Sequence, residues 1–152
     1  MTQLEANTQR RLISQLKRQE GLRLDAYLDT EGVWTIGYGS TTGVTEGMTI
    51  TKKVAELLLI DDIKKAESDA SKLPGFAEMS QVRKAGFINV IFNIGYTKFS
   101  RWRNTMAALE AKDWRKVHMN MVDSIWVDQV GVRACEICAQ IRLNRWVKTS
   151  LL

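Results

Sequence analysis

The sequence predicts an α+β fold that is mainly helical, with a small β lobe, a long connecting helix and a helical C-terminal lobe. Three observations lead to this prediction. Apolar residues recur at helical spacing before residue 20, alternate with other residues over 22–28, and cover almost every side of a helix over 82–94. The 152 residues, of which 45% are hydrophobic, suit one compact domain or two small lobes that share a core.

The first helix is predicted to end at Glu20. Leu12, Ile13 and Leu16 lie on the same helical face as Glu20. Gly21 follows directly, and glycine is the residue that most often ends a helix. The Glu20 carboxyl is therefore expected to face the interior beside the negative end of the helix dipole, an environment suited to a proton donor.

A β hairpin is predicted next. Residues 22–28 alternate as in a half-buried strand, and residues 33–38 are rich in β-branched and aromatic side chains. Between them, Asp29 and Gly32 stand where a type I turn favours aspartate and glycine. A third short strand is expected within residues 44–50.

Helices are predicted for most of the remaining chain. Thr51 is a suitable N-cap for a long helix that ends before the Leu-Pro-Gly sequence at 73–75. Ser80 is a suitable cap for the buried helix over 82–94. Shorter helices are expected over 104–112, 114–122 and 132–146.

The net charge of +5 is unevenly distributed. Residues 1–75 carry 10 basic and 11 acidic side chains, a balance of −1, whereas residues 76–152 carry 12 and 6, a balance of +6. A basic half indicates an extended anionic partner. Nucleic acid, an acidic membrane surface and an acidic cell-wall polymer all meet this description.

Neither a metal nor a cofactor is expected. Cys135 and Cys138 form a lone C-x-x-C without the second pair or the histidines that a zinc site needs, so we expect a reduced structural pair. Basic residues within 10–18 interrupt any apolar secretory signal, and no window approaches the ~18 apolar residues of a membrane span. We therefore expect a protein of the cytoplasm without stable membrane insertion.

Glu20, Asp29 and Thr35 form the candidate catalytic set. Each alone has a structural explanation, as a helix-end residue, a turn residue that bonds its own backbone, and a β-branched strand residue. Together they place one carboxyl beside apolar residues and a second in a polar turn, which is how glycosidases separate the acid from the base. The Thr35 hydroxyl is suited to holding a water molecule.

The spacing Glu20, eight residues, Asp29, five residues, Thr35 resembles that of the phage-type lysozymes of glycoside hydrolase family 24. The surrounding segments are similar as well, namely EGLRL, DTEG and TIGYG within 20–39 and VRKAGFINVIFNIG over 82–95. The resemblance extends over nearly the whole chain. It implies a lysozyme-like two-lobe fold and hydrolysis, with inversion, of the β-1,4 bond between N-acetylmuramic acid and N-acetylglucosamine in bacterial peptidoglycan.

The resemblance also implies residue roles. Glu20 would protonate the leaving oxygen, while Asp29 would position and activate water with the help of Thr35. Further positions are similar to substrate contacts of the family: Thr41, Phe92, Thr105, Asn120 and Arg133. Arg133 resembles the arginine that faces the general acid.

Two departures from the family pattern concern the β lobe. Ser40 stands where close relatives have histidine, so an ion pair to the following helix is expected to be absent. The segment 41–50 is shorter than in the T-even type of the family, so the lower edge of the substrate site is expected to differ.

The sequence thus predicts an endolysin, a lysozyme that lyses the bacterial host of a phage. We expect a monomer that binds peptidoglycan and no nucleic acid, and that reaches the wall in the periplasm after a holin permeabilises the membrane. The alternatives are a basic helical nucleic-acid-binding protein and a membrane-disrupting protein, neither of which accounts for residues 20–39.

One catalytic domain is expected to span residues 1–152. Its predicted parts are a β lobe over 21–51, a connecting helix over 52–73, and a helical lobe made of 1–20 and 74–152.

Overall fold

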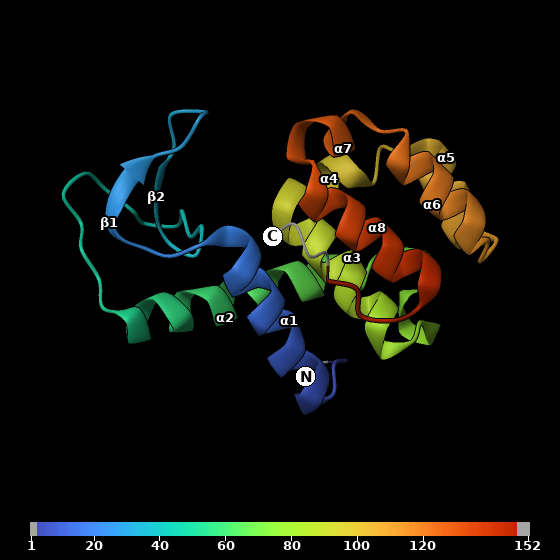
Figure 1. Cartoon of the computed structure of the whole chain (residues 1–152), viewed down its shortest axis with the longest axis horizontal. Coiled ribbons are helices and arrows are strands. Elements are labelled where there is room, and N and C mark those ends of the chain that lie inside the picture. The colour runs from blue at the N-terminus through green and yellow to red at the C-terminus, as the bar shows by residue number, and fades with distance from the viewer. Residues whose placement is uncertain (1–2, 149–152) are drawn as a thin grey trace. The chain divides into compact units, whose positions relative to one another are not determined.

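The structure is a computed structural model that describes residues 3–148, and it contains a small antiparallel sheet and a larger set of helices (Figure 1). The mainly helical α+β fold predicted from the sequence is confirmed. The chain divides into two compact units. We call residues 10–65 the β unit, and the described residues 3–9 and 66–148 the helical unit. That the whole chain forms one catalytic domain stays a prediction.

Two helices contribute residues to both units. Helix α1 spans Ala6–Glu20 and helix α2 spans Lys52–Ala70. Thr51 caps α2 as predicted, because its Oγ1 accepts a hydrogen bond of 3.2 Å from the Val54 N–H. Leu12 and Leu16, on the apolar face of α1, are fully buried, so the periodicity of the sequence identifies the packed face of this helix.

The β unit contains the predicted hairpin. Strands β1 (Arg23–Leu28) and β2 (Trp34–Gly37) pair antiparallel, with Tyr27 opposite Thr35. The turn is closed by two backbone hydrogen bonds, from Asp29 N–H to the Val33 carbonyl at 3.0 Å and from Gly32 N–H to the Asp29 carbonyl at 3.1 Å. The hairpin therefore holds Asp29 and Thr35 at neighbouring positions on paired strand ends.

The third strand expected within 44–50 is not present among the described residues. Asp25 and Thr49 form only an isolated antiparallel bridge, and two backbone hydrogen bonds of 2.9 Å join the segment to β1. The prediction was wrong because Gly43 and Gly47 adopt left-handed φ angles of 72° and 80°, which interrupt an extended backbone.

Helix α3 (Gln81–Ile94) is the buried helix of the helical unit, as its apolar sequence predicted. Ser80 caps it by accepting a hydrogen bond of 3.2 Å from the Arg83 N–H, which confirms the predicted cap. Helix α8 (Val132–Leu143) packs against α3 (Figure 1). The two helices approach closely, because a Cβ built at Gly86 would lie only 2.8 Å from Ile141 Cγ1.

The remaining helices of this unit are η1 (Phe76–Glu78), α4 (Tyr96–Phe99), α5 (Arg103–Glu110), α6 (Trp114–Val122) and α7 (Ile125–Val130). The predicted short helices correspond to α5, α6 and α8. Helix α8 ends three residues before the predicted residue 146, because Asn144 adopts a left-handed conformation with φ of 55°. Helices α4 and α7 were not predicted.

Aromatic rings fill much of the interior of the helical unit. Phe99 lies between Phe87 and Trp102, with ring centroids 6.2 Å and 5.1 Å away, and Trp102 lies 6.2 Å from Trp126. These distances are typical of interacting aromatic pairs. A search of residues 3–148 finds no helix that is both long and apolar enough to cross a membrane.

Candidate active site

Glu20 is the last residue of α1, and the structure places its carboxyl against the turn that follows β2. The helix stops because Gly21 turns left-handed, with φ of 72°, while its N–H still bonds the Lys17 carbonyl at 3.1 Å. A Cβ built at Gly39 would lie 3.1 Å from Glu20 Oε2. Only glycine therefore leaves ordinary room for the half-buried Glu20 carboxyl at this position.

The turn that contains Gly39 is held at both ends. Ile36 and Ser40 exchange two backbone hydrogen bonds of 2.9 Å each, and Gly39 itself adopts a φ of 90°. This tight turn brings the backbone close to Glu20. Gly39 is a site residue that the sequence analysis missed, although the Gly-Tyr-Gly sequence at 37–39 was a signal for an unusual backbone.

Ser40 links this turn to α2. Its Oγ donates a hydrogen bond of 2.7 Å to Asp62 Oδ2, and Ser40 is buried. The sequence analysis expected the loss of an ion pair at this position. The structure has a charge-assisted hydrogen bond from serine to the same helix, so the turn behind Glu20 is still tied to α2.

Asp29 is held by one of its two carboxylate oxygens. Oδ1 accepts hydrogen bonds from the N–H groups of Glu31, at 2.9 Å, and Val33, at 2.8 Å. Oδ2 accepts no hydrogen bond from any residue within 3–148. The carboxylate is thus fixed in orientation by the turn while one half-exposed oxygen stays available for a water molecule.

Thr35 is anchored to the same residue as Asp29. Its Oγ1 donates a hydrogen bond of 2.9 Å to the Val33 carbonyl, and its side chain is only 4% exposed. Because the hydroxyl proton is used in this bond, the lone pairs of Oγ1 are left to accept a hydrogen bond from another group. The backbone of Val33 thus orients both Asp29 and Thr35, a role that no side-chain pattern could reveal.

Lys17, three residues before Glu20 on the same side of α1, pairs with another residue. Lys17 Nζ forms an ion pair of 3.2 Å with Glu56 Oε2 on α2. The same ammonium lies 5.8 Å from the centre of the Tyr38 ring. The positive charge of Lys17 is therefore directed to Glu56 on α2 and to the Tyr38 ring rather than to the Glu20 carboxyl.

The predicted substrate contacts are divided between the two units. Thr41 is exposed in the β unit, whereas Phe92, Thr105, Asn120 and Arg133 belong to the helical unit. Phe92 and Asn120 are half-buried. Thr105 is buried, with 2% of its surface exposed. All five remain predictions.

Two polar residues of the helical unit have defined partners. Arg133 Nη2 donates a hydrogen bond of 3.3 Å to Asn89 Oδ1, and Asn89 is fully buried in α3. Asn120 lines a groove of about 460 Å³ between α5 and α6 together with Asn104 and Lys116. The guanidinium of Arg133 is thus partly oriented by α3, and Asn120 borders an open groove.

The cysteine pair has one exposed and one buried member. Cys135 is exposed, whereas Cys138 is 1% exposed and burial raises the pKa of its thiol to about 12. Cys138 is therefore a neutral thiol at physiological pH and a poor metal ligand. Within residues 3–148, no group of three or more histidine, cysteine, aspartate or glutamate side chains is arranged to hold a metal ion.

Comparison with known proteins identifies relatives over most of the chain. Residues 17–148 match the family model described as phage lysozyme. The endolysin of Salmonella phage P22 is 39% identical over 93 residues, which are 58% of this chain and 63% of that protein. The endolysin of Acyrthosiphon pisum secondary endosymbiont phage 1 is 38% identical over 88 residues, covering 56% of this chain and 58% of that protein.

A more distant relative is matched over more of its length. The probable T4-type lysozyme 1 of Dictyostelium discoideum is 26% identical over 153 residues, which cover 83% of this chain and 90% of that protein. In contrast, the chain matches less than two thirds of the length of each of the two endolysins.

Proposed function

Since the chain belongs to the phage lysozyme family, we propose that it is an endolysin that cleaves bacterial peptidoglycan. The bond cleaved is the β-1,4 linkage between N-acetylmuramic acid and N-acetylglucosamine. The observation that carries this proposal is the hydrogen bonding of Asp29, whose Oδ1 is fixed by two backbone N–H groups while Oδ2 is left for water. Thr35, opposite Tyr27 on the paired strand, adds a second anchored oxygen at the same end of the hairpin.

In the proposed mechanism the two carboxyls have separate tasks. Glu20 donates its proton to the glycosidic oxygen as the bond between that oxygen and the anomeric carbon breaks. Asp29 Oδ2 accepts a proton from a water molecule, whose oxygen attacks the anomeric carbon from the opposite face. The second O–H of this water donates a hydrogen bond to Thr35 Oγ1, whose own proton is donated to the Val33 carbonyl.

Attack from the opposite face inverts the configuration at the anomeric carbon. The α anomer of the new reducing end should therefore appear first when a soluble glycan fragment is cleaved inside an NMR tube. The β anomer should then grow only by mutarotation. If the β anomer appears first, the mechanism is retaining, and Asp29 acts as a nucleophile instead of a base.

The proposed activity is tested by analysing what the protein releases from purified peptidoglycan. Mass spectrometry after borohydride reduction should find soluble fragments that end in reduced N-acetylmuramic acid. Fragments that end in reduced N-acetylglucosamine, or free peptides with intact glycan strands, would contradict the proposal. If a DNA gel shift or leakage of liposomes occurs without any release from the wall, the nucleic-acid-binding or membrane-disrupting alternative is favoured.

The route to the wall is part of the same proposal. The protein accumulates in the cytoplasm as a monomer and reaches the periplasm once a holin or a similar partner permeabilises the membrane. Expressed alone in a Gram-negative cell, it should fractionate with the cytoplasm, and brief chloroform treatment should start lysis. Lysis without any membrane damage, or recovery from the periplasm of intact cells, would contradict this route.

A further inference from the structure

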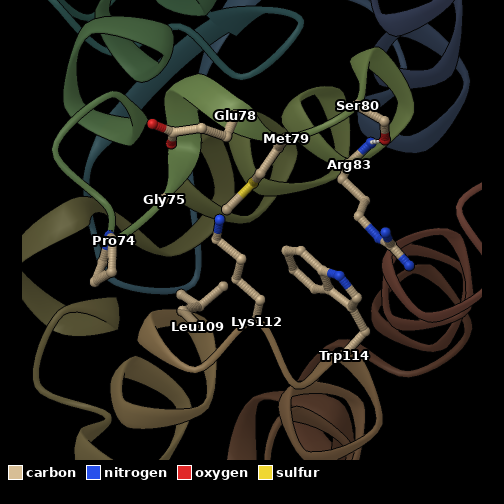
Figure 2. A pocket seen from close by; sticks show the side chains of 9 residues that line it. All are labelled: Pro74, Gly75, Glu78, Met79, Ser80, Arg83, Leu109, Lys112 and Trp114. Atoms are coloured by element: carbon tan, nitrogen blue, oxygen red, sulfur yellow. Dashed lines mark hydrogen bonds between the residues drawn. The ribbon is translucent and has the colours of Figure 1, made fainter.

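A pocket of about 140 Å³ lies within the helical unit, and none of the catalytic candidates Glu20, Asp29 and Thr35 lines it (Figure 2). Met79, Leu109 and Trp114 contribute apolar walls, and the side chain of Lys112 reaches into the space between them (Figure 2). Arg83 lies beside Trp114 in the same view. The pocket thus combines apolar walls with two cationic side chains and one acidic side chain, Glu78.

Only one of these two cations is available to a ligand. The guanidinium of Arg83 lies 4.2 Å from the centre of the Trp114 ring, and its Nε donates a hydrogen bond of 2.8 Å to the Ile141 carbonyl. In contrast, the Lys112 ammonium has no hydrogen bond or ion pair with any residue in the described part of the chain. Glu78 also lines the pocket but forms no ion pair with Lys112.

Lys112 occupies a backbone position that disfavours lysine. Lys112 follows α5 and has a left-handed φ of 55°. Its N–H donates a hydrogen bond of 3.0 Å to the Leu109 carbonyl. The next N–H, that of Asp113, donates a hydrogen bond of 2.9 Å to the Ala108 carbonyl. These two bonds define a Schellman motif, in which this residue is usually glycine or asparagine. The corresponding position after α8 is indeed asparagine, Asn144. An exposed lysine in a strained conformation, with its unpaired ammonium at a pocket, points to a function.

The volume of the pocket and the ammonium of Lys112 indicate a small ligand that carries a negative charge. A cavity of about 150 Å³ holds a molecule of roughly six heavy atoms such as benzene. The terminal residue of a peptide ending in alanine has a similar size, with one methyl group for the apolar walls and one carboxylate for Lys112. A phosphate dianion would lack a methyl group for Met79, Leu109 and Trp114, and it would find only one unengaged cation.

We propose that this pocket binds the terminal carboxylate of a short peptide whose last side chain is no larger than that of alanine. The proposal rests on the proposed function, because the peptides of peptidoglycan end in D-alanine. The pocket would hold the enzyme on its polymer through the peptides, independently of the sugar chemistry at Glu20.

The test is an NMR titration of the ¹⁵N-labelled full chain with N-acetyl-D-alanyl-D-alanine and, separately, with its C-terminal amide. The indole signal of Trp114 is identified by its loss in Trp114→Phe. The acid should shift this signal saturably, and the amide should bind at least tenfold more weakly. Lys112→Met should abolish the shift and Lys112→Arg should restore it, whereas Lys98→Met, which removes an exposed lysine outside the pocket, should leave it unchanged.

A second variant separates binding from folding. Lys112→Gly relieves the left-handed strain, so it should raise the midpoint of thermal unfolding while it abolishes peptide binding. Equal binding of acid and amide, equal binding by Lys112→Met, or a stronger response to inorganic phosphate than to the peptide would overturn the proposal. Glu20→Gln should lose hydrolysis but bind the peptide like wild type. Wild-type protein that binds the peptide without hydrolysing peptidoglycan would reject the proposed function alone, whereas wild-type protein that hydrolyses peptidoglycan without binding the peptide would reject this pocket alone.

Discussion

Replacing Gly39 by alanine should impair the position of the Glu20 carboxyl without unfolding the protein. The new Cβ would lie 3.1 Å from Glu20 Oε2, whereas ordinary contacts begin at 3.4 Å, so the carboxyl must move by a few tenths of an ångström. A misplacement of ~1 Å can cost about 10²-fold in rate, and a shift of this smaller size should cost about fourfold or more. The φ of 90° adds backbone strain of roughly 1–2 kcal/mol.

Gly47→Ala is the matched control. Gly47 has a similar φ of 80°, but a Cβ built there has nothing within 4 Å. Both variants should therefore lose about 1–2 kcal/mol of unfolding free energy in urea titrations. Only Gly39→Ala should lose activity per folded molecule, measured as the initial rate at which reducing ends are released from purified peptidoglycan. Equal activity of the two variants would refute the reasoning that Glu20 acts from the position seen in the structure.

Three further predictions concern the hairpin, the turn behind Glu20 and the cysteines. Asp29→Asn should keep the turn, because Oδ1 of the asparagine still accepts both N–H bonds. The variant should lose activity about 10²–10⁴-fold, because an amide cannot accept the proton of the attacking water. A nearly active variant would show that Asp29 is not a catalytic base. Ser40→Ala removes the hydrogen bond to Asp62, so it should lower the free energy of unfolding by about 1.5 kcal/mol in urea titrations. An unchanged free energy of unfolding would show that this hydrogen bond contributes nothing to stability. At pH 8 iodoacetamide should label Cys135 but label Cys138 only after unfolding. Burial raises the pKa of the folded Cys138 thiol to about 12, whereas the unfolded thiol has the ordinary pKa of 9.0. The contribution of the neutral thiol to the free energy of unfolding is therefore complete below pH 9.0 and is lost as the pH rises from 9.0 to 12. Cys138→Ala should lack this decline.

The features that the sequence predicted well have local causes. Thr51 and Ser80 were identified as helix caps because a side-chain hydroxyl before an apolar periodic segment satisfies a free N–H of the first turn. The hairpin around Asp29 was identified for a similar reason, since an aspartate and a glycine at set positions define the turn without help from distant residues. The places of Glu20 at the end of α1 and of Asp29 in the turn follow from the same local reasoning, whereas the catalytic roles of both residues and of Thr35 stay predictions.

The features that the sequence did not predict depend on backbone geometry or on distant partners. The close approach of Gly39 to Glu20 joins residues 19 positions apart in the chain, and the bond from Ser40 to Asp62 joins residues 22 apart. The left-handed conformation of Lys112 runs against the preference of its residue type. Such contacts arise only once the elements are packed, so neither spacing nor propensity could reveal them.

The most direct test of the central claim compares wild type with Glu20→Gln in the release of reducing ends from purified peptidoglycan. The substitution keeps the shape of the side chain and removes the transferable proton, so the rate should fall by about 10²–10⁴-fold or more. Circular dichroism and the urea midpoint should show that folding is unchanged, and Ser14→Ala, at an exposed position of α1, should keep most of the activity. A folded Glu20→Gln protein that releases reducing ends at a rate near that of wild type would contradict the account.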